Sequence, residues 1–246
     1  VYGVASKEDC VGDLFYGTDY HSHLGTVRGG LAVSNRDGFT RAIKDITNAQ
    51  FRSKIEDELS AMHGSMGIGV ISDYEDQPLI IGSHLGNYAL VTVGRIDNLA
   101  ELAAAVFQNR TAHFSEMSGG MVNPTELVAT IINREGNFVD GLRQVQASIE
   151  GSCSILLMTD RCIYAARDRL GRTPLVLGEK EDSHCVALET CALPNLGYEV
   201  LRYLGPGEIV RITADEVETV SPPGDRMQIC SFLWVYYGYP ASDYEG

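Results

Sequence analysis

The feature that most constrains the fold is a change of pattern at Ser152. C-terminal to it, short apolar runs alternate with turn residues, and pairs such as Asp160-Arg161 and Ala214-Asp215 are typical of hairpin turns. Strands are predicted in this part over residues 154–159, 162–166, 175–177, 185–188, 208–212 and 216–220. This half of the chain is therefore expected to form antiparallel sheet.

The first half of the chain combines helical and strand patterns. Phe51, Ile55 and Leu59 recur at intervals of four residues among charged side chains, which predicts an amphipathic helix from Gln50 to Met62. Pro124 fits the first turn of another helix, where its missing N–H costs nothing. Further helices are predicted over residues 11–18, 99–108 and 137–146, and strands over 1–5, 31–33, 67–71, 79–83 and 88–93. Together the two halves predict an α+β fold with much antiparallel sheet.

Length and charge limit the functions open to this chain. Its 246 residues can bury one large core, so a single main domain is expected. A formal net charge of −14 repels phosphate backbones and anionic lipids, which argues against nucleic acid and membrane partners. No apolar run approaches the roughly 20 residues of a spanning helix, and the N-terminus lacks the basic and apolar regions of a signal peptide. We therefore predict a cytoplasmic protein.

Metal sites and disulfides are not expected. The six cysteines are scattered and include no C-x-x-C pair, which favours reduced thiols over a zinc site or a disulfide framework. His21 and His23 are two residues apart on a predicted helix, where their side chains diverge, so they are not expected to share a metal ion.

Two segments carry a resemblance to a known family. Arg167-Asp-Arg-Leu-Gly-Arg-Thr-Pro-Leu175 resembles the R-D-x-x-G-x-R-P-L turn of class II glutamine amidotransferases, and Cys230 to Pro240 resembles the C-x-F-E-x-x-Y-x-x-R-P segment of amidophosphoribosyltransferases. The resemblance implies a four-layer αββα sandwich of the N-terminal-nucleophile hydrolase type, with mostly antiparallel sheets. It also implies a glutamine amidotransferase type 2-like domain over residues 1–226. Residues 227–246 would then begin the linker to a phosphoribosyltransferase domain.

The same resemblance locates the expected nucleophile. In the family an N-terminal Cys is followed by Gly-Val-Phe-Gly-Ile, and Val1-Tyr2-Gly3-Val4 matches the last four residues of that motif. The nucleophilic Cys would therefore lie two positions before Val1. Its thiol attacks the glutamine amide carbon while the free α-amine moves the proton, a role that a Val side chain cannot take.

The resemblance also assigns a glutamine pocket, here called the predicted pocket, to Leu24, Ser72, Val93, Gly94 and Pro124. Leu24 and Ser72 take the places of two arginines, the second of which holds the substrate carboxylate through a charge-assisted contact. Val93 replaces the Asn amide of the oxyanion hole, beside a retained Gly94, and such a loss typically costs about 100- to 1000-fold in rate. Pro124 replaces the Asp that binds the substrate amine.

Three functions follow from this pattern. The leading hypothesis is a glutaminase-like domain of an amidophosphoribosyltransferase homologue, from the purine biosynthesis family, that lacks glutaminase activity and acts as a structural, docking or regulatory module. The alternative is an active glutaminase that supplies ammonia for phosphoribosylamine synthesis, with its Cys upstream of Val1. A third option is a binding module for a ligand less charged than glutamine. The expected partners are the protein's own phosphoribosyltransferase domain and further copies of the chain.

Three local features receive structural interpretations. Arg167 and Asp168 are predicted to form a turn-stabilising ion pair. Cys230 matches a position that ligates an iron–sulfur cluster in one branch of the family, but here it is predicted to be a plain buried thiol, and no cofactor is expected. The aromatic segment from Phe232 to Tyr239 is expected to be a strand that folds back on the core or forms a dimer contact.

Overall fold

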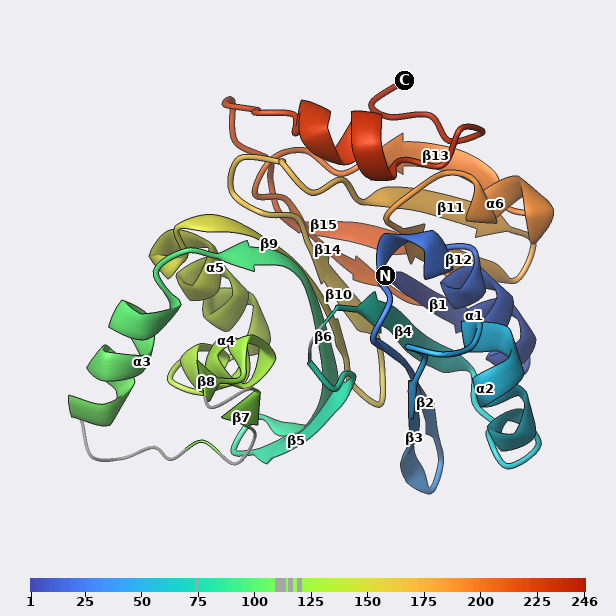
Figure 1. Cartoon of the computed structure of the whole chain (residues 1–246), viewed down its shortest axis with the longest axis horizontal. Coiled ribbons are helices and arrows are strands. Elements are labelled where there is room, and N and C mark those ends of the chain that lie inside the picture. The colour runs from blue at the N-terminus through green and yellow to red at the C-terminus, as the bar shows by residue number, and fades with distance from the viewer. Residues whose placement is uncertain (74, 109–113, 115–116, 119–120) are drawn as a thin grey trace.

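The protein is an αββα sandwich in which two antiparallel sheets stack face to face (Figure 1). This computed structural model describes residues 1–73, 75–108, 114, 117–118 and 121–246. One group of helices covers the outer face of each sheet, so the molecule has the four layers that the resemblance implies.

The larger sheet has seven strands in the order β13 (Glu199–Tyr203), β11 (Val176–Lys180), β12 (Ser183–Ala187), β1 (Tyr2–Ser6), β4 (Met66–Ser72), β2 (Arg28–Asn35) and β3 (Gly38–Asp45). The smaller sheet has the order β15 (Val217–Ser221), β14 (Ile209–Ile212), β10 (Ile163–Ala166), β9 (Gly151–Met158), β6 (Gly86–Ile96) and β5 (Leu79–Ser83). A small hairpin pairs β7 (Met117–Ser118) with β8 (Met121–Val122).

Helices α1 to α5 begin at, or one residue from, the positions that the sequence predicts, whereas α6 was not predicted. The larger sheet is covered by α1 (Val11–Asp19), α2 (Phe51–Leu59) and α6 (Ala192–Asn195), and the smaller one by α3 (Leu99–Gln108), α4 (Pro124–Ile132) and α5 (Phe138–Ser148). Two short helical segments, η1 (Ser22–Leu24) and η2 (Leu233–Tyr237), are also present. Asn123 caps α4 by accepting a hydrogen bond from the backbone N–H of Glu126, with Pro124 as the first helical residue.

Alternation along the strands builds three apolar layers. In β1, Tyr2 and Val4 point outward and pack beneath α1, whereas Ala5 points inward between the sheets. The inner layer also holds Val91 and Leu156 from the smaller sheet, and the third layer lies under α3, α4 and α5. This arrangement leaves the strand ends and their connecting loops as the places where sites can form.

Some elements differ from the sequence predictions. Strands β3 and β13 were not predicted, because both are edge strands in which polar residues interrupt the apolar pattern. The predicted strand from Phe232 to Tyr239 is wrong, because η2 is helical and the N–H of Gly238 donates to the carbonyl of Leu233. A helical turn brings Phe232 to 4.7 Å from Tyr236 between ring centroids, a contact that an extended strand does not allow.

None of the helices in the described part of the chain is both long and apolar enough to cross a membrane.

Candidate functional site

The predicted pocket residues lie at one end of the sandwich. Ser72 is the last residue of β4, Val93 and Gly94 lie toward the C-terminal end of β6, Pro124 begins α4, and Leu24 ends η1. Leu24 and Val93 both pack against the core layer between the sheets, which also contains Val1.

Leu24 lies next to Ser72 because the following residue, Gly25, packs closely against the end of β4. A Cβ atom placed on Gly25 would lie 3.3 Å from the backbone nitrogen of Ser72 and 2.9 Å from Ile71. This close approach holds the end of η1 against the end of β4, so Leu24 and Ser72 belong to one neighbourhood.

A buried network centred on Glu75 connects the other members. The backbone N–H of Glu75 donates to Oγ of Ser72 at 3.2 Å. Its carboxylate accepts hydrogen bonds from the backbone N–H and the hydroxyl of Thr125, at 3.3 and 3.1 Å, and from the side-chain amide of Gln77 at 2.8 Å. Glu75 therefore ties the end of β4 to the first turn of α4, next to Pro124.

Thr92 closes the same network from β6. Its backbone N–H donates to the side-chain oxygen of Gln77 at 2.7 Å, its carbonyl accepts from the amide nitrogen of Gln77 at 3.2 Å, and its hydroxyl lies 2.6 Å from that of Thr125. Because Thr92 precedes Val93 and Thr125 follows Pro124, these contacts bring β6 and α4 together. The ends of β4 and β6 and the first turn of α4 therefore lie next to one another, with Thr92 on the α4 face of β6 and Val93 on its other face, against the layer between the sheets.

The chemistry available at these positions is limited. Leu24, Val93 and Pro124 carry no polar side-chain atom, and the hydroxyl of Ser72 already accepts a hydrogen bond from Glu75. No side chain of the predicted pocket therefore carries a charge or an amide donor for a substrate.

Gly94 has a structural reason to be glycine. Its φ of 131° lies in the region that favours glycine, and a Cβ atom there would lie 2.1 Å from the backbone oxygen of Ser152. The pairing of β6 with β9 therefore requires glycine at this position whether or not an oxyanion is stabilised nearby.

Glu75 is the member of this region that sequence reasoning missed. Its residue is only 5% exposed, and burial raises the pKa of its carboxyl to about 7 although hydrogen bonds from Thr125 and Gln77 favour the charged form. The available signal was an acidic residue three positions after Ser72, a member of the predicted pocket.

A second buried carboxylate, Glu189, also lies near the start of β1, since the N–H of Leu188 donates to the carbonyl of Val1. Glu189 lies 3.2 Å from Nε2 of His23 and accepts a hydrogen bond from the hydroxyl of Tyr244 at 2.7 Å. Burial opposes ionisation of Glu189, but the hydrogen bonds from His23 and Tyr244 outweigh it and lower the pKa to about 2. Glu189 is therefore a buried anion whose charge is satisfied within the protein.

His21 is a neutral core histidine. Its Nδ1 donates to the carbonyl of Gly17 at 2.7 Å, and its Nε2 accepts from the backbone N–H of Glu189 at 3.2 Å. Burial lowers the pKa of His21 to about 3. His21 accepts a hydrogen bond from the backbone N–H of Glu189, and His23 contacts the carboxylate of Glu189. The two histidine side chains, which the sequence predicted to diverge, therefore contact the same residue.

Glu189 also holds the end of the chain. We call residues 239–245 the C-terminal strap. Within it, the N–H of Tyr239 and the hydroxyl of Ser242 donate to Glu189 at 3.3 and 3.1 Å. The N–H of Asp243 donates to the hydroxyl of Thr190 at 2.8 Å, and Tyr244 is 8% exposed. The strap therefore folds back onto the core.

The predicted ion pair between Arg167 and Asp168 is wrong. The guanidinium of the buried Arg167 donates to the backbone carbonyls of Leu204 and Gly171 and pairs with Glu245 of the strap. The carboxylate of Asp168 instead accepts a backbone N–H bond from Thr173 at 2.8 Å. Both side chains stabilise turns, but each does so through backbone groups, because those groups are otherwise unpaired in the turns.

The described residues contain no group of three or more His, Cys, Asp or Glu side chains that could hold a metal ion. All six cysteines are free. Cys230 is partly rather than fully buried, because it lies just before the exposed η2, and its Sγ accepts from the N–H of Leu233 at 3.4 Å.

Comparison with known proteins agrees with the geometry. A family model described as a glutamine amidotransferase domain matches residues 63–195. Amidophosphoribosyltransferase of Bacillus subtilis is 28% identical over 260 residues, which cover 100% of this chain and 52% of that protein. Amidophosphoribosyltransferase of Archaeoglobus fulgidus is 28% identical over 171 residues, which cover 69% of this chain and 37% of that protein. The chain spans about half the length, or less, of these curated relatives.

Solved structures show the same fold. The glutamine phosphoribosylpyrophosphate amidotransferase from B. subtilis, complexed with ADP and GMP, matches with a TM-score of 0.88 and 25% identity over 100% of this chain and 54% of that chain. A glutamine aminotransferase class-II domain protein from Silicibacter pomeroyi matches with a TM-score of 0.54 at 11% identity, over 91% of this chain and 99% of that one, which shows the fold alone. The predicted αββα fold class is confirmed.

Proposed function

The chain belongs to the glutamine amidotransferase domain family, and we propose that it is the glutaminase-like domain of an amidophosphoribosyltransferase homologue in which glutamine hydrolysis has been lost. In this proposal the domain is a cytoplasmic structural or regulatory module for a phosphoribosyltransferase half. The observation that carries the proposal is the content of the predicted pocket, where Leu24, Ser72, Val93 and Pro124 stand at positions that bind or activate glutamine in the family.

Glutamine presents an α-carboxylate and an α-ammonium group, and both charges need partners when they leave water. Ser72 offers no cation for the carboxylate, and Pro124 offers no anion for the ammonium group. The carboxylate of Glu75 lies near Pro124, but it is already engaged by Thr125 and Gln77. A glutamine molecule in this region would therefore lose hydration without gaining ionic contacts.

A glutaminase assay tests the proposal on the protein expressed from its complete gene. We expect no glutamate release above background, no labelling of the N-terminus by a glutamine analogue that alkylates thiols, and no rise in melting temperature with glutamine. The B. subtilis amidophosphoribosyltransferase serves as the positive control. A turnover near one per second, within the usual range of enzymes, would contradict the proposal.

The rival function is an active glutaminase with a Cys before Val1. Retention of Gly94 favours it, but the contact with Ser152 gives this glycine a purely structural reason. Accurate intact mass together with N-terminal sequencing of the purified protein separates the two functions. A free N-terminal Cys combined with glutamine-dependent labelling would establish the rival.

The partner proposal rests on an exposed surface, here called the aromatic patch. Its members are 45–73% exposed and comprise Phe232, Trp234, Val235, Tyr236, Tyr237 and Tyr239. A patch of this size is seldom left in contact with water, since each aromatic side chain can bury roughly 150–250 Å². We propose that the phosphoribosyltransferase half covers it in the full-length protein, and that a second copy covers it when these 246 residues stand alone.

Light scattering tests the second part of this proposal. The 246-residue chain is expected to run as a dimer, and a Val235→Ser, Tyr236→Ser double variant as a monomer, because these two side chains are 72% and 73% exposed and lie outside the core. Arg95→Gln, an exposed change on β6, is the control and should remain dimeric. If the parent chain is monomeric, or if both variants dimerise equally, the aromatic patch does not mediate self-association.

A further inference from the structure

A cleft of about 1020 Å³ lies at the end of the sandwich opposite the predicted pocket. It is lined by the turn between β2 and β3, the turn between β5 and β6, and the turn between β9 and β10. Along β6, Gly86 lines the cleft and Gly94 belongs to the predicted pocket, eight residues away, which corresponds to roughly 26 Å of extended strand. The cleft is therefore separate from the region discussed above.

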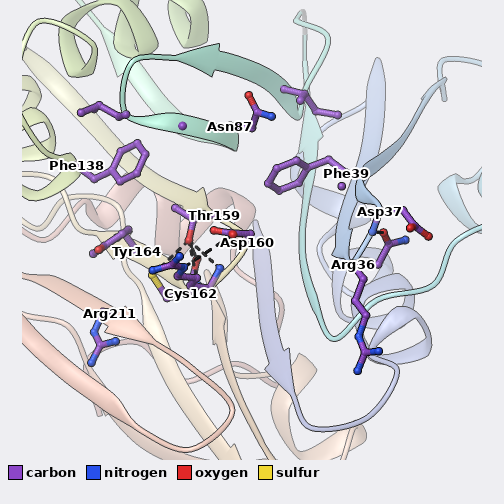
Figure 2. A pocket seen from close by; sticks show the side chains of 16 residues that line it. Arg36, Asp37, Phe39, Asn87, Phe138, Thr159, Asp160, Cys162, Tyr164 and Arg211 are labelled. Atoms are coloured by element: carbon purple, nitrogen blue, oxygen red, sulfur yellow. Dashed lines mark hydrogen bonds and ion pairs between the residues drawn. The ribbon is translucent and has the colours of Figure 1, made fainter.

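Two aromatic rings form opposite walls of the cleft. Figure 2 shows Phe39 on one side and Phe138 on the other, with Thr159 and Asp160 between them. Phe138 is held in place because its ring packs edge-on against Tyr88, with 5.2 Å between centroids. Phe39 packs against the core layer between the sheets. Both rings are thus anchored from behind while they line the cleft, which suits a planar aromatic ligand.

Three arginines line the cleft, but only one is well suited to a ligand. Arg211 is engaged by Glu216 and Glu218, at 2.9 and 2.8 Å. Arg36 has no ion pair within the described part of the chain, and in Figure 2 it extends away from both phenylalanines.

Arg161 belongs to the turn that forms the floor of the cleft. Its nearest carboxylate is that of its neighbour Asp160 at 3.9 Å, with side chains 88% and 74% exposed, and a contact of this kind contributes little in water. The guanidinium of Arg161 is therefore available to a carboxylate ligand.

The acidic side chains limit how much negative charge a ligand can carry. Asp37 and Asp160 also line the cleft, so a ligand with several negative charges would be repelled. We propose that this cleft binds a planar aromatic monocarboxylate of small-molecule size, with its ring between Phe39 and Phe138 and its carboxylate against Arg161. This inference does not depend on the proposed function.

Binding of naphthalene-2-carboxylate, followed by calorimetry or ligand-observed NMR on the 246-residue protein, tests the inference. We expect saturable binding with a Kd near or below about 1 mM, as about thirteen non-hydrogen atoms give at ordinary ligand efficiency. The neutral naphthalene-2-carboxamide should bind about fivefold more weakly, since it lacks the charge that pairs with Arg161.

Variants assign the contacts. Arg161→Gln should weaken the carboxylate about fivefold and leave the carboxamide unchanged, whereas Arg36→Gln, the matched control with the same loss of charge, should leave both unchanged. Phe39→Leu should weaken both ligands about three- to tenfold, and its melting temperature checks that the fold is retained. The inference is overturned if no saturable binding occurs below 5 mM, if the two ligands bind equally, or if Arg36→Gln and Arg161→Gln have the same effect.

Discussion

The buried carboxyl of Glu75 should make the stability of this protein depend on pH in an unusual direction. Burial raises its pKa to about 7 in the folded protein, from an ordinary value of 4.5. Between these two values the folded state keeps a proton that the unfolded state has released. The free energy of unfolding therefore falls as pH rises from 4.5 to 7, and this contribution is fully lost above pH 7.

The size of the effect follows from the same two values. A shift of one pKa unit corresponds to about 1.4 kcal/mol, so the stability contributed by Glu75 changes by about 3 kcal/mol between pH 4 and pH 8. Glu75→Gln removes the titration. The variant also carries a cost of about 1–3 kcal/mol for a mismatched hydrogen bond, because the amide of Gln77 is fixed from both sides by Thr92 and cannot turn over. That second cost is the same at every pH.

Urea unfolding of both proteins at several pH values separates the two terms. We expect the difference in unfolding free energy between the wild type and Glu75→Gln to move by about 3 kcal/mol in favour of the variant from pH 4 to pH 8. Glu101→Gln, which removes an exposed carboxylate from α3, controls for the change in net charge. A difference that stays constant to about 0.5 kcal/mol over this range would refute the desolvation of Glu75.

Two further predictions concern backbone strain and the C-terminal strap. Gly94→Ala should lower the free energy of unfolding by at least about 1–3 kcal/mol, because φ is 131° and the new Cβ meets the oxygen of Ser152; unchanged urea unfolding would contradict this. Glu189→Gln should speed hydrogen exchange at the amides of Ser242 and Asp243, which donate to Tyr239 and Thr190, at least about tenfold, because it weakens charge-assisted hydrogen bonds that hold the strap. The surface variant Asp182→Asn should leave that exchange unchanged, and equal rates in all three proteins would show that Glu189 does not hold the strap.

Local signals in the sequence predicted most of the helices and strands. The start of α4 is an example, because Asn123 and Pro124 act on the backbone groups next to them, and nothing distant is needed. The edge strands β5 and β15 were predicted, but the edge strand β3 was missed, because it is paired on one side only and its residues need not alternate strictly between apolar and polar. The resemblance supplied what local patterns could not, namely the stacking of the two sheets.

The buried hydrogen bonds of Glu75 and Glu189 could not be predicted from the sequence. Glu75 and Thr125 are separated by 50 residues, and Glu189 and Tyr244 by 55, so neither contact leaves a local pattern. For Arg167 and Asp168, in contrast, the sequence predicted a contact that the structure does not contain. Adjacent opposite charges indicated a pair, whereas the folded chain uses each side chain for backbone groups that only the tertiary turn brings near.

The residues now found in the predicted pocket are those that favour the fold. Pro124 removes a carboxylate but is well suited to the first position of α4. Leu24 and Val93 remove a cation and an amide but pack against the core between the sheets, and the hydroxyl of Ser72 is used by Glu75. Active sites usually hold polar groups at a cost in stability. Selection would no longer maintain those groups in a protein that has lost the chemistry. The proposed loss of catalysis with retention of the framework would account for all four positions together, whereas an active glutaminase would require four separate compensations in one pocket.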